Sequence, residues 1–148
     1  MDENTGAMNT EDWVQVNGTW YNFDEDGSMN TGWEQVNGTW YYMAESGAMT
    51  TGWQQVGGKW YYFKNWGGMA TGWMQINGTW YYLQPSGAMA TGWQQIDGTW
   101  YYLKDWGGMA TGWQEVNGKW YYFYASGAMA ADTTIDGYTV DASGAWVE

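Results

Sequence analysis

The sequence contains no histidine, no cysteine and no arginine, and each absence removes a class of chemistry. Without histidine and cysteine there is no imidazole base, no thiol nucleophile, no disulfide and none of the usual zinc ligands. The carboxylates that remain are scattered, with no recurrent close pairing. We therefore expect a protein that is not an enzyme and that holds neither a metal nor a cofactor.

Positive charge is also scarce, because four lysines stand against 16 acidic residues and give a formal net charge of -12. Such a chain repels phosphate backbones, which argues against nucleic acid as a partner and favours a cationic ligand. No apolar run approaches the ~20 residues needed to span a bilayer. The opening Met1-Asp2-Glu3-Asn4 lacks the basic and apolar regions of a signal peptide, so we expect an exported natural protein to be longer than this chain.

Aromatic residues and glycine dominate what is present, with 15 Trp, 13 Tyr and 23 Gly. They fall in a unit, Thr-Gly-Trp-x-x-x-Asn-Gly-x-Trp-Tyr-Tyr, that recurs every 20 residues. One unit is too short to bury its own rings, so they must pack between neighbouring units or stay open for a ligand. The mean hydropathy of -0.60 favours an elongated solenoid over a sphere. The tryptophan pairs are Trp33/Trp40, Trp53/Trp60, Trp73/Trp80, Trp93/Trp100 and Trp113/Trp120, preceded by Trp13/Trp20.

Each unit is predicted to contain a β-hairpin with a two-residue turn that needs positive φ. In the second unit, Val36 should face Thr39, Gln35 should face Trp40, and Trp33 should face Tyr42. Strand alternation then puts Trp33, Gln35, Trp40 and Tyr42 on one face and Val36, Tyr41 and Met43 on the other, which we take as the structural face. The turn pairs are Asn17-Gly18, Asn37-Gly38, Gly57-Gly58, Asn77-Gly78, Asp97-Gly98 and Asn117-Gly118.

The two ends of the chain differ from the repeats. Residues 1–12 are predicted to be part of a preceding repeat, because Thr5-Gly6-Ala7-Met8 resembles a closing loop. Residues 13–129 form the repeats, and residues 130–148 are predicted to be a degenerate capping hairpin, with Thr133 where a tryptophan is expected. A solenoid needs such caps because each repeat is stabilised by its neighbours.

Two tryptophans and a tyrosine on one face could form an aromatic cage for a cation that lacks hydrogen-bond donors. Packing between repeats would use the same rings, and the residue types alone leave both interpretations open. The pattern itself, with Thr31-Gly32-Trp33, Gly38-Thr39-Trp40-Tyr41-Tyr42 and Gly47-Ala48-Met49, resembles the choline-binding (cell-wall-binding) repeats of surface proteins and lysins of pneumococci, related streptococci and their phages. The resemblance covers residues 6–129, and the Thr-Thr-Ile-Asp-Gly-Tyr segment resembles the ends of such modules.

The resemblance implies an all-β fold, a β-solenoid of about six stacked hairpins in a left-handed superhelix plus a C-terminal cap. It also implies non-covalent attachment to phosphocholine of teichoic or lipoteichoic acids outside the bacterial cell. In this family a site uses the two tryptophans of one hairpin and a tyrosine of the next. The expected choline-binding groups are Trp13, Trp20 and Tyr42; Trp33, Trp40 and Tyr62; Trp53, Trp60 and Tyr82; Trp73, Trp80 and Tyr102; and Trp93, Trp100 and Tyr122.

The residues leave the roles of several side chains open. Trp113 and Trp120 meet Val140 at the shifted tyrosine position, where Tyr138 is the available substitute. Trp66 and Trp106 could extend the binding surface, pack on the exterior or support self-association. The methionines at 29, 49, 69, 89, 109 and 129 could line the cages or anchor the loops. The alternative functions are a glucan-binding repeat that stacks sugars on the same rings and a purely structural spacer.

Overall fold

The computed structural model describes residues 13–24 and 26–148, and every element in them is a β-strand. The chain divides into two units, Met1–Ala70 and Thr71–Glu148. The predicted partial repeat over residues 1–12 lies outside the described residues. The first unit holds β1 (Trp13–Val16), β2 (Thr19–Asn22), β3 (Gly32–Val36), β4 (Thr39–Met43), β5 (Gly52–Val56) and β6 (Lys59–Phe63). The second holds β7 (Gly72–Ile76), β8 (Thr79–Leu83), β9 (Gly92–Ile96), β10 (Thr99–Leu103), β11 (Gly112–Val116), β12 (Lys119–Phe123), β13 (Thr133–Ile135), β14 (Tyr138–Val140) and β15 (Trp146–Val147).

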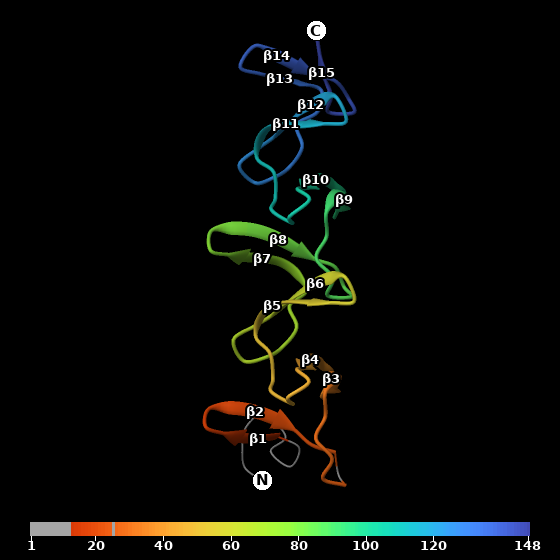
Figure 1. Ribbon diagram of the computed structural model, residues 1–148. Coiled ribbons are helices and arrows are strands. Elements are labelled where there is room, and N and C mark those ends of the chain that lie inside the picture. The colour runs from red at the N-terminus through yellow and green to blue at the C-terminus, as the bar shows by residue number, and fades with distance from the viewer. Residues whose placement is uncertain (1–12, 25) are drawn as a thin grey trace. The chain divides into compact units, whose positions relative to one another are not determined.

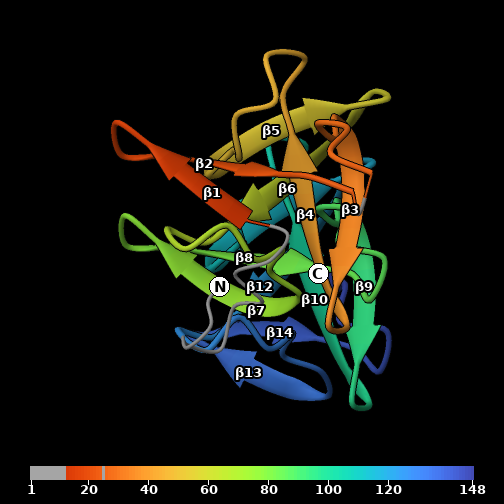
Figure 2. The same cartoon turned by 90° about the horizontal axis from the view of Figure 1, so that it is seen from below.

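The predicted hairpins and their register are confirmed. Val36 pairs with Thr39, Gln35 with Trp40 and Trp33 with Tyr42, and the ladder extends by one further pair. The turns adopt the expected conformation, since φ is 52° at Asn37 and 83° at Gly38 and the equivalent positions match in every hairpin. Each hairpin from β1-β2 to β11-β12 is a separate two-stranded sheet, and the hairpins of the first unit point in different directions when seen from below (Figure 2).

Within each unit, backbone hydrogen bonds join the loop that follows one hairpin to the hairpin before that one. Figure 1 shows the course of these loops between the hairpins. The N–H of Met49 in the loop after β4 donates to the carbonyl of Trp20 in β2 at 2.9 Å, and Met129 donates to Trp100 in the same way. These bonds satisfy backbone groups that an isolated hairpin would leave to water. Stability therefore depends on contacts between successive repeats, as expected for a solenoid.

The loops also stack on one another through methionine and glycine. A Cβ atom added to Gly127 would lie 2.3 Å from the sulfur of Met109, and Gly127 has a φ of 92°. The same approach joins Gly47 to Met29 and Gly144 to Met129. Glycine is required there for its conformation and for the space it leaves to the thioether. The methionines therefore anchor the loops, which was one of their two predicted roles.

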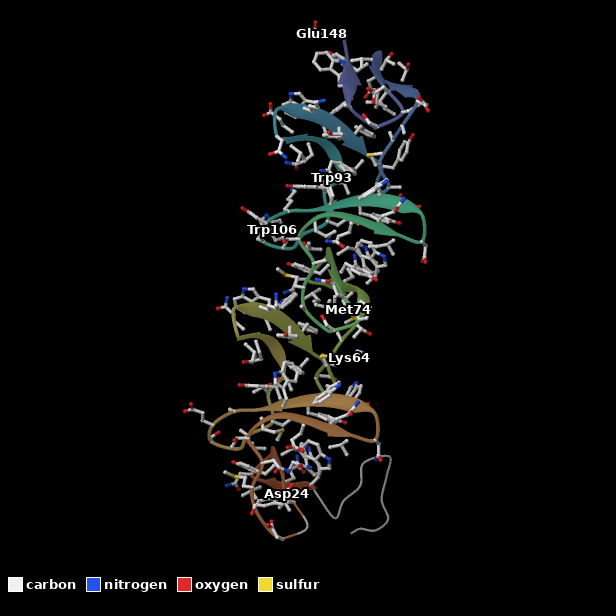
Figure 3. All side chains as sticks on the ribbon, turned by 90° about the vertical axis from the view of Figure 1, so that its right-hand side faces the viewer. Asp24, Lys64, Met74, Trp93, Trp106 and Glu148 are labelled. Carbon is white, nitrogen blue, oxygen red and sulfur yellow. The ribbon has the colours of Figure 1, made fainter. Side chains whose placement is uncertain are left out.

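The largest buried side chains include the last residue of the second strand in each of the five hairpins from β3-β4 to β11-β12. Met43, Phe63, Leu83, Leu103 and Phe123 are 0–1% exposed, and side chains fill the spaces between successive hairpins of each unit (Figure 3). Tyr41, on the same face as Met43, is 8% exposed and packs with Trp13. The predicted structural face thus carries the core, although Val36 is only half-buried.

The C-terminal segment forms a three-stranded sheet in the order β13-β14-β15. The shortened hairpin predicted around Asp136-Gly137 is present, with Thr133 paired to Val140 and Ile135 to Tyr138. Its third strand was not predicted: Trp146 in β15 pairs with Val140. Val140 is 1% exposed, so the residue at the shifted tyrosine position belongs to the core.

Candidate functional site: aromatic cages between successive hairpins

The two tryptophans of a hairpin come from its two strands, and their rings lie next to each other. Trp93 in β9 and Trp100 in β10 have ring centroids 6.2 Å apart and planes at 84°. This edge-to-face arrangement is a favourable one for indoles, and it places two ring faces around one corner. The pairs Trp13/Trp20, Trp33/Trp40, Trp53/Trp60 and Trp73/Trp80 have the same geometry, with centroids 6.1–6.5 Å apart.

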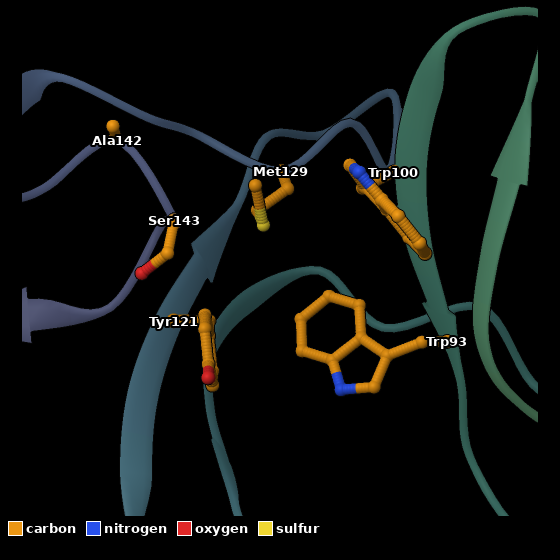
Figure 4. Close-up of a pocket in the computed structure, with 6 residues that line it drawn as sticks. All are labelled: Trp93, Trp100, Tyr121, Met129, Ala142 and Ser143. Atoms are coloured by element: carbon orange, nitrogen blue, oxygen red, sulfur yellow. The ribbon is translucent and has the colours of Figure 1, made fainter.

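The following hairpin supplies a third ring. Tyr121 in β12 lies 4.8 Å from Trp93 between ring centroids, with the planes at 75°. Together with Trp100, these rings bound a pocket of about 420 Å³ that Met129 and two residues of a later loop complete. Figure 4 shows Trp100 and Tyr121 on either side of this pocket with Trp93 between them. The later-loop residues are Ala142 and Ser143.

An equivalent pocket of about 380 Å³ lies one repeat earlier, bounded by Trp73, Trp80, Tyr101 and Met109. Its rim is formed by Ala125 and Ser126, which again come from the loop that follows the next hairpin but one. Each of these two pockets therefore takes rings from two successive hairpins and a rim from a third. Met109 and Met129 line these pockets as well as anchoring the loops.

In the two repeat pockets described above, the tyrosine beside the tryptophan pair differs from the one predicted to share a group with it. The role of each group in binding choline stays a prediction. Tyr122 lies 5.2 Å from Trp113 of its own hairpin, whereas Tyr121 lies against Trp93. The prediction assumed that all rings of a cage share one face of their strands. Within a stack, the tryptophan face of one hairpin meets the opposite face of the next, so the tyrosine on that opposite face completes the cage.

The same difference in the neighbouring tyrosine is found in the other groups within each unit. Tyr41 replaces Tyr42 beside Trp13, Tyr61 replaces Tyr62 beside Trp33, and Tyr101 replaces Tyr102 beside Trp73, at centroid distances of 4.9 Å. Trp53 lies 5.2 Å from Tyr62 of its own hairpin. The group of Trp53, Trp60 and Tyr82 draws on both units and stays a prediction.

A family model described as a choline-binding repeat matches residues 10–51, 50–91, 70–111, 90–133 and 110–140. The chain belongs to the choline-binding repeat family. No match was found among curated protein sequences.

Three solved structures show what this choline-binding repeat chain is similar to. CbpJ from Streptococcus pneumoniae TIGR4 is 53% identical over 91% of this chain and 47% of its own, with a TM-score of 0.89. Choline binding protein F from Streptococcus pneumoniae is 54% identical over 92% and 47%, also with a TM-score of 0.89. The pneumococcal cell wall endolysin from phage Cp-1, complexed with choline, is 36% identical over 80% and 36%, with a TM-score of 0.57. The chain thus spans less than half the length of these proteins.

The cap of this choline-binding repeat chain carries a further aromatic pocket of about 300 Å³. Trp113 and Trp120 line it together with Tyr138 in β14 and Trp146 in β15. Tyr138 lies 6.0 Å from Trp113 and 6.2 Å from Trp146 between ring centroids. Tyr138 therefore supplies the aromatic ring that Val140, at the expected tyrosine position, does not have. Trp146 adds a fourth ring, which the repeat pattern gave no reason to include.

The chemistry of the pockets is apolar and aromatic. The pocket beside Trp93 is lined by three rings, one thioether, one methyl group and one hydroxyl, with no charged side chain. The described residues contain no cluster of acidic side chains able to hold a metal ion. They also contain no helix long and apolar enough to cross a membrane. Burial raises the pKa of Tyr41, so this ring stays an uncharged phenol at neutral pH.

Proposed function

We propose that the chain is a non-catalytic module that binds choline in the aromatic cages between its hairpins. The observation that carries this proposal is the pocket bounded by Trp93, Trp100 and Tyr121, in which three ring faces surround an open space without any charged side chain. Ring faces attract cations, each by ~0.5–2 kcal/mol depending on desolvation. After the costs of association, a single cage should bind choline with an affinity on the order of millimolar to micromolar.

The angles between the rings favour a quaternary ammonium over a sugar. Trp93 and Trp100 meet at 84°, and Trp93 and Tyr121 meet at 75°. Such a corner suits a compact, roughly spherical group such as trimethylammonium. A sugar ring would need a flat face to stack on and several polar groups for its hydroxyls, whereas the only polar side chains lining this pocket are Ser143, Tyr121 and the indole N–H groups.

Solvent exposure argues against a purely structural spacer. The second tryptophan remains 39–41% exposed in each of the five hairpins from β3-β4 to β11-β12. A spacer would gain from burying these rings, since each buries much apolar area. The rings in question are Trp40, Trp60, Trp80, Trp100 and Trp120.

We infer further that the module anchors a protein to phosphocholine of teichoic or lipoteichoic acids at a bacterial surface. Repeated weak sites suit this role because linked cages raise avidity by a factor on the order of 10²–10⁴ when one polymer spans them. Two of the similar proteins carry choline in their names or were solved with choline bound. The attached effector would lie in the remainder of a longer protein.

Isothermal titration with choline, ethanolamine and dextran tests this function. Choline has no N–H group to satisfy, whereas ethanolamine would lose hydrogen bonds to water that ring faces cannot replace. Unpaired polar groups cost ~1–3 kcal/mol, so choline should bind about tenfold more tightly or better. Equal affinities for the two amines would mean that the net negative charge attracts any cation. Binding of dextran alone would support the glucan alternative.

A further inference from the structure

One methionine thioether forms part of the wall of each repeat pocket. Met109 lines the pocket of about 380 Å³, and Met129 lines the pocket of about 420 Å³. Figure 4 shows the Met129 side chain facing the same space as Trp100 and Tyr121. Both methionines are half-buried, so a small molecule that enters either pocket meets the thioether.

A glycine of the following loop packs against the other side of each thioether. A Cβ atom on Gly127 would overlap the sulfur of Met109, and one on Gly144 would overlap the sulfur of Met129. The backbone N–H of each methionine also donates to the carbonyl of a tryptophan of the same pocket, at 2.9 Å. The sulfur is therefore held between a glycine backbone and the aromatic rings.

We propose that Met109 and Met129 are oxidation sites through which a peroxide closes the cages to choline. This inference rests on the proposed binding of choline in the cages. The thioether sulfur takes one oxygen atom from hydrogen peroxide and becomes a sulfoxide, while the peroxide is reduced to water. The sulfur loses the two electrons that the peroxide gains, so no further reactant is needed.

The new oxygen has no position that leaves the cage intact. On the glycine side there is too little room even for a methyl group, so an oxygen there would displace the loop. On the pocket side the oxygen would place a polar atom among ring faces, in the space that the trimethylammonium needs. A polar atom buried without a hydrogen-bond donor is costly, and choline binding should weaken about 5- to 150-fold at each oxidised pocket.

The pocket in the cap provides a contrast within the same chain. Among the described residues, four aromatic side chains and no methionine line it. Peroxide should therefore leave this pocket unaltered. The sensitivity to oxidation belongs to the repeat pockets, where a thioether replaces the fourth ring.

A choline headgroup in a cage would cover the sulfur, so an occupied pocket should resist oxidation. Peptide mass spectrometry of the whole chain, treated with dilute hydrogen peroxide with and without choline, measures this protection. With choline at 10 times its Kd, about one cage in eleven is free, so oxidation of Met109 and Met129 should slow about tenfold.

Met29 is the internal control for this measurement. It packs on Gly47 as the other methionines pack on their glycines, it is 43% exposed, and it lines neither repeat pocket. Its oxidation should proceed at the same rate with and without choline. Equal protection of Met29, or no protection of Met109 and Met129, would overturn the inference.

Isothermal titration with choline before and after peroxide treatment measures the effect on binding. Leucine matches methionine in volume but cannot be oxidised, so the double variant Met109→Leu and Met129→Leu should lose two fewer sites to peroxide than the unmodified chain. The matched control Met29→Leu should lose as many sites as the unmodified chain. Each treated protein is compared with its own untreated form.

Equal losses in all three proteins would overturn the inference, as would an unmodified chain that binds choline equally well after oxidation. Absence of choline binding by the untreated, unmodified chain would instead overturn the proposed function.

Discussion

Tyr121 and Tyr122 are neighbours in β12, and their side chains point to opposite sides of the hairpin. Tyr121 lies against Trp93 of the preceding hairpin and lines its pocket. Tyr122 lies against Trp113 of its own hairpin. A single step along the strand therefore separates a ring that completes a cage from a ring that supports one.

The substitution Tyr121→Ala should remove one choline site, because the pocket beside Trp93 would lose its third wall. Tyr122→Ala should keep that site and mainly lower the melting temperature, because it deletes a packing contact within a hairpin. The stoichiometry of choline binding distinguishes them, with the thermal unfolding of each variant measured in parallel. Loss of this site in Tyr122→Ala and its retention in Tyr121→Ala would restore the grouping predicted from the sequence.

The sequence was sufficient to predict which tryptophans lie together, but not which tyrosine lies beside them. Trp33 and Trp40 follow from hairpin spacing, because the register places them diagonally on one face. Strand alternation also separates Tyr41 from Tyr42. Strand alternation does not determine which face of a hairpin meets the next hairpin. That depends on how the loop turns the chain, and the loops have no alternation of apolar and polar residues that would indicate it.

The hairpins and the cap differ in how strongly short-range signals define them. A pair such as Asn37-Gly38 determines a turn because few residues tolerate positive φ at both positions. The third strand of the cap, β15, consists of Trp146 and Val147 alone and has no such signal. It forms through tertiary pairing with β14, and for this reason the pocket that contains Trp146 could not be predicted from the repeat.

The loop that joins β14 to β15 depends on the Asp141 carboxylate. Asp141 accepts hydrogen bonds from the hydroxyl of Ser143 at 2.6 Å, from its backbone N–H at 2.9 Å, and from the backbone N–H of Ala145 at 3.1 Å. The hydroxyl of Ser143 is the main cause that holds the pKa of Asp141 below its ordinary value, followed by the backbone donors, with a small contribution from Lys119. The ionised carboxylate therefore favours the folded cap.

This hydrogen bonding predicts a pH-dependent stability of the cap. A carboxylate with a lowered pKa in the folded state stabilises that state above the unfolded pKa of about 3.9, and the stabilisation is lost as the pH falls through the folded pKa. Asp141→Asn should therefore melt at a lower temperature than the unmodified chain at pH 7, and the difference should vanish in more acidic solution. Thermal unfolding followed from pH 7 to about pH 2.5 measures it.

Asp97→Asn is the matched control for this experiment, because it installs at a turn the residue found at Asn37, Asn77 and Asn117. It removes the same charge without touching the cap. A melting difference for Asp141→Asn that stays constant with pH would show that the carboxylate acts through its shape and not through its ionisation.

Considered as a molecule, the chain builds each of its two best-defined repeat pockets from three successive repeats. The pocket beside Trp93 takes two rings from one hairpin, Tyr121 and Met129 from the next repeat, and its rim at Ser143 from the cap. No isolated repeat contains a complete site. Ligand binding therefore stabilises the stacking of the repeats, because the complete pocket exists only when the repeats are stacked.

Choline should accordingly raise the melting temperature of the chain progressively with its concentration. A site that exists only in the folded state stabilises that state by about 2.7 kcal/mol when the ligand is present at 100 times its Kd. For a chain of this length, 1 kcal/mol corresponds to a shift of about 2–4 °C. Ethanolamine at the same concentration and ionic strength should give a much smaller shift in melting temperature. It carries the same charge, but the desolvation of its N–H groups opposes binding. If ethanolamine stabilised the chain as strongly as choline, the acidic surface and not the cages would be the source of the effect. If choline produced no shift at concentrations that saturate binding in a titration, the bound ligand could not lie between the repeats.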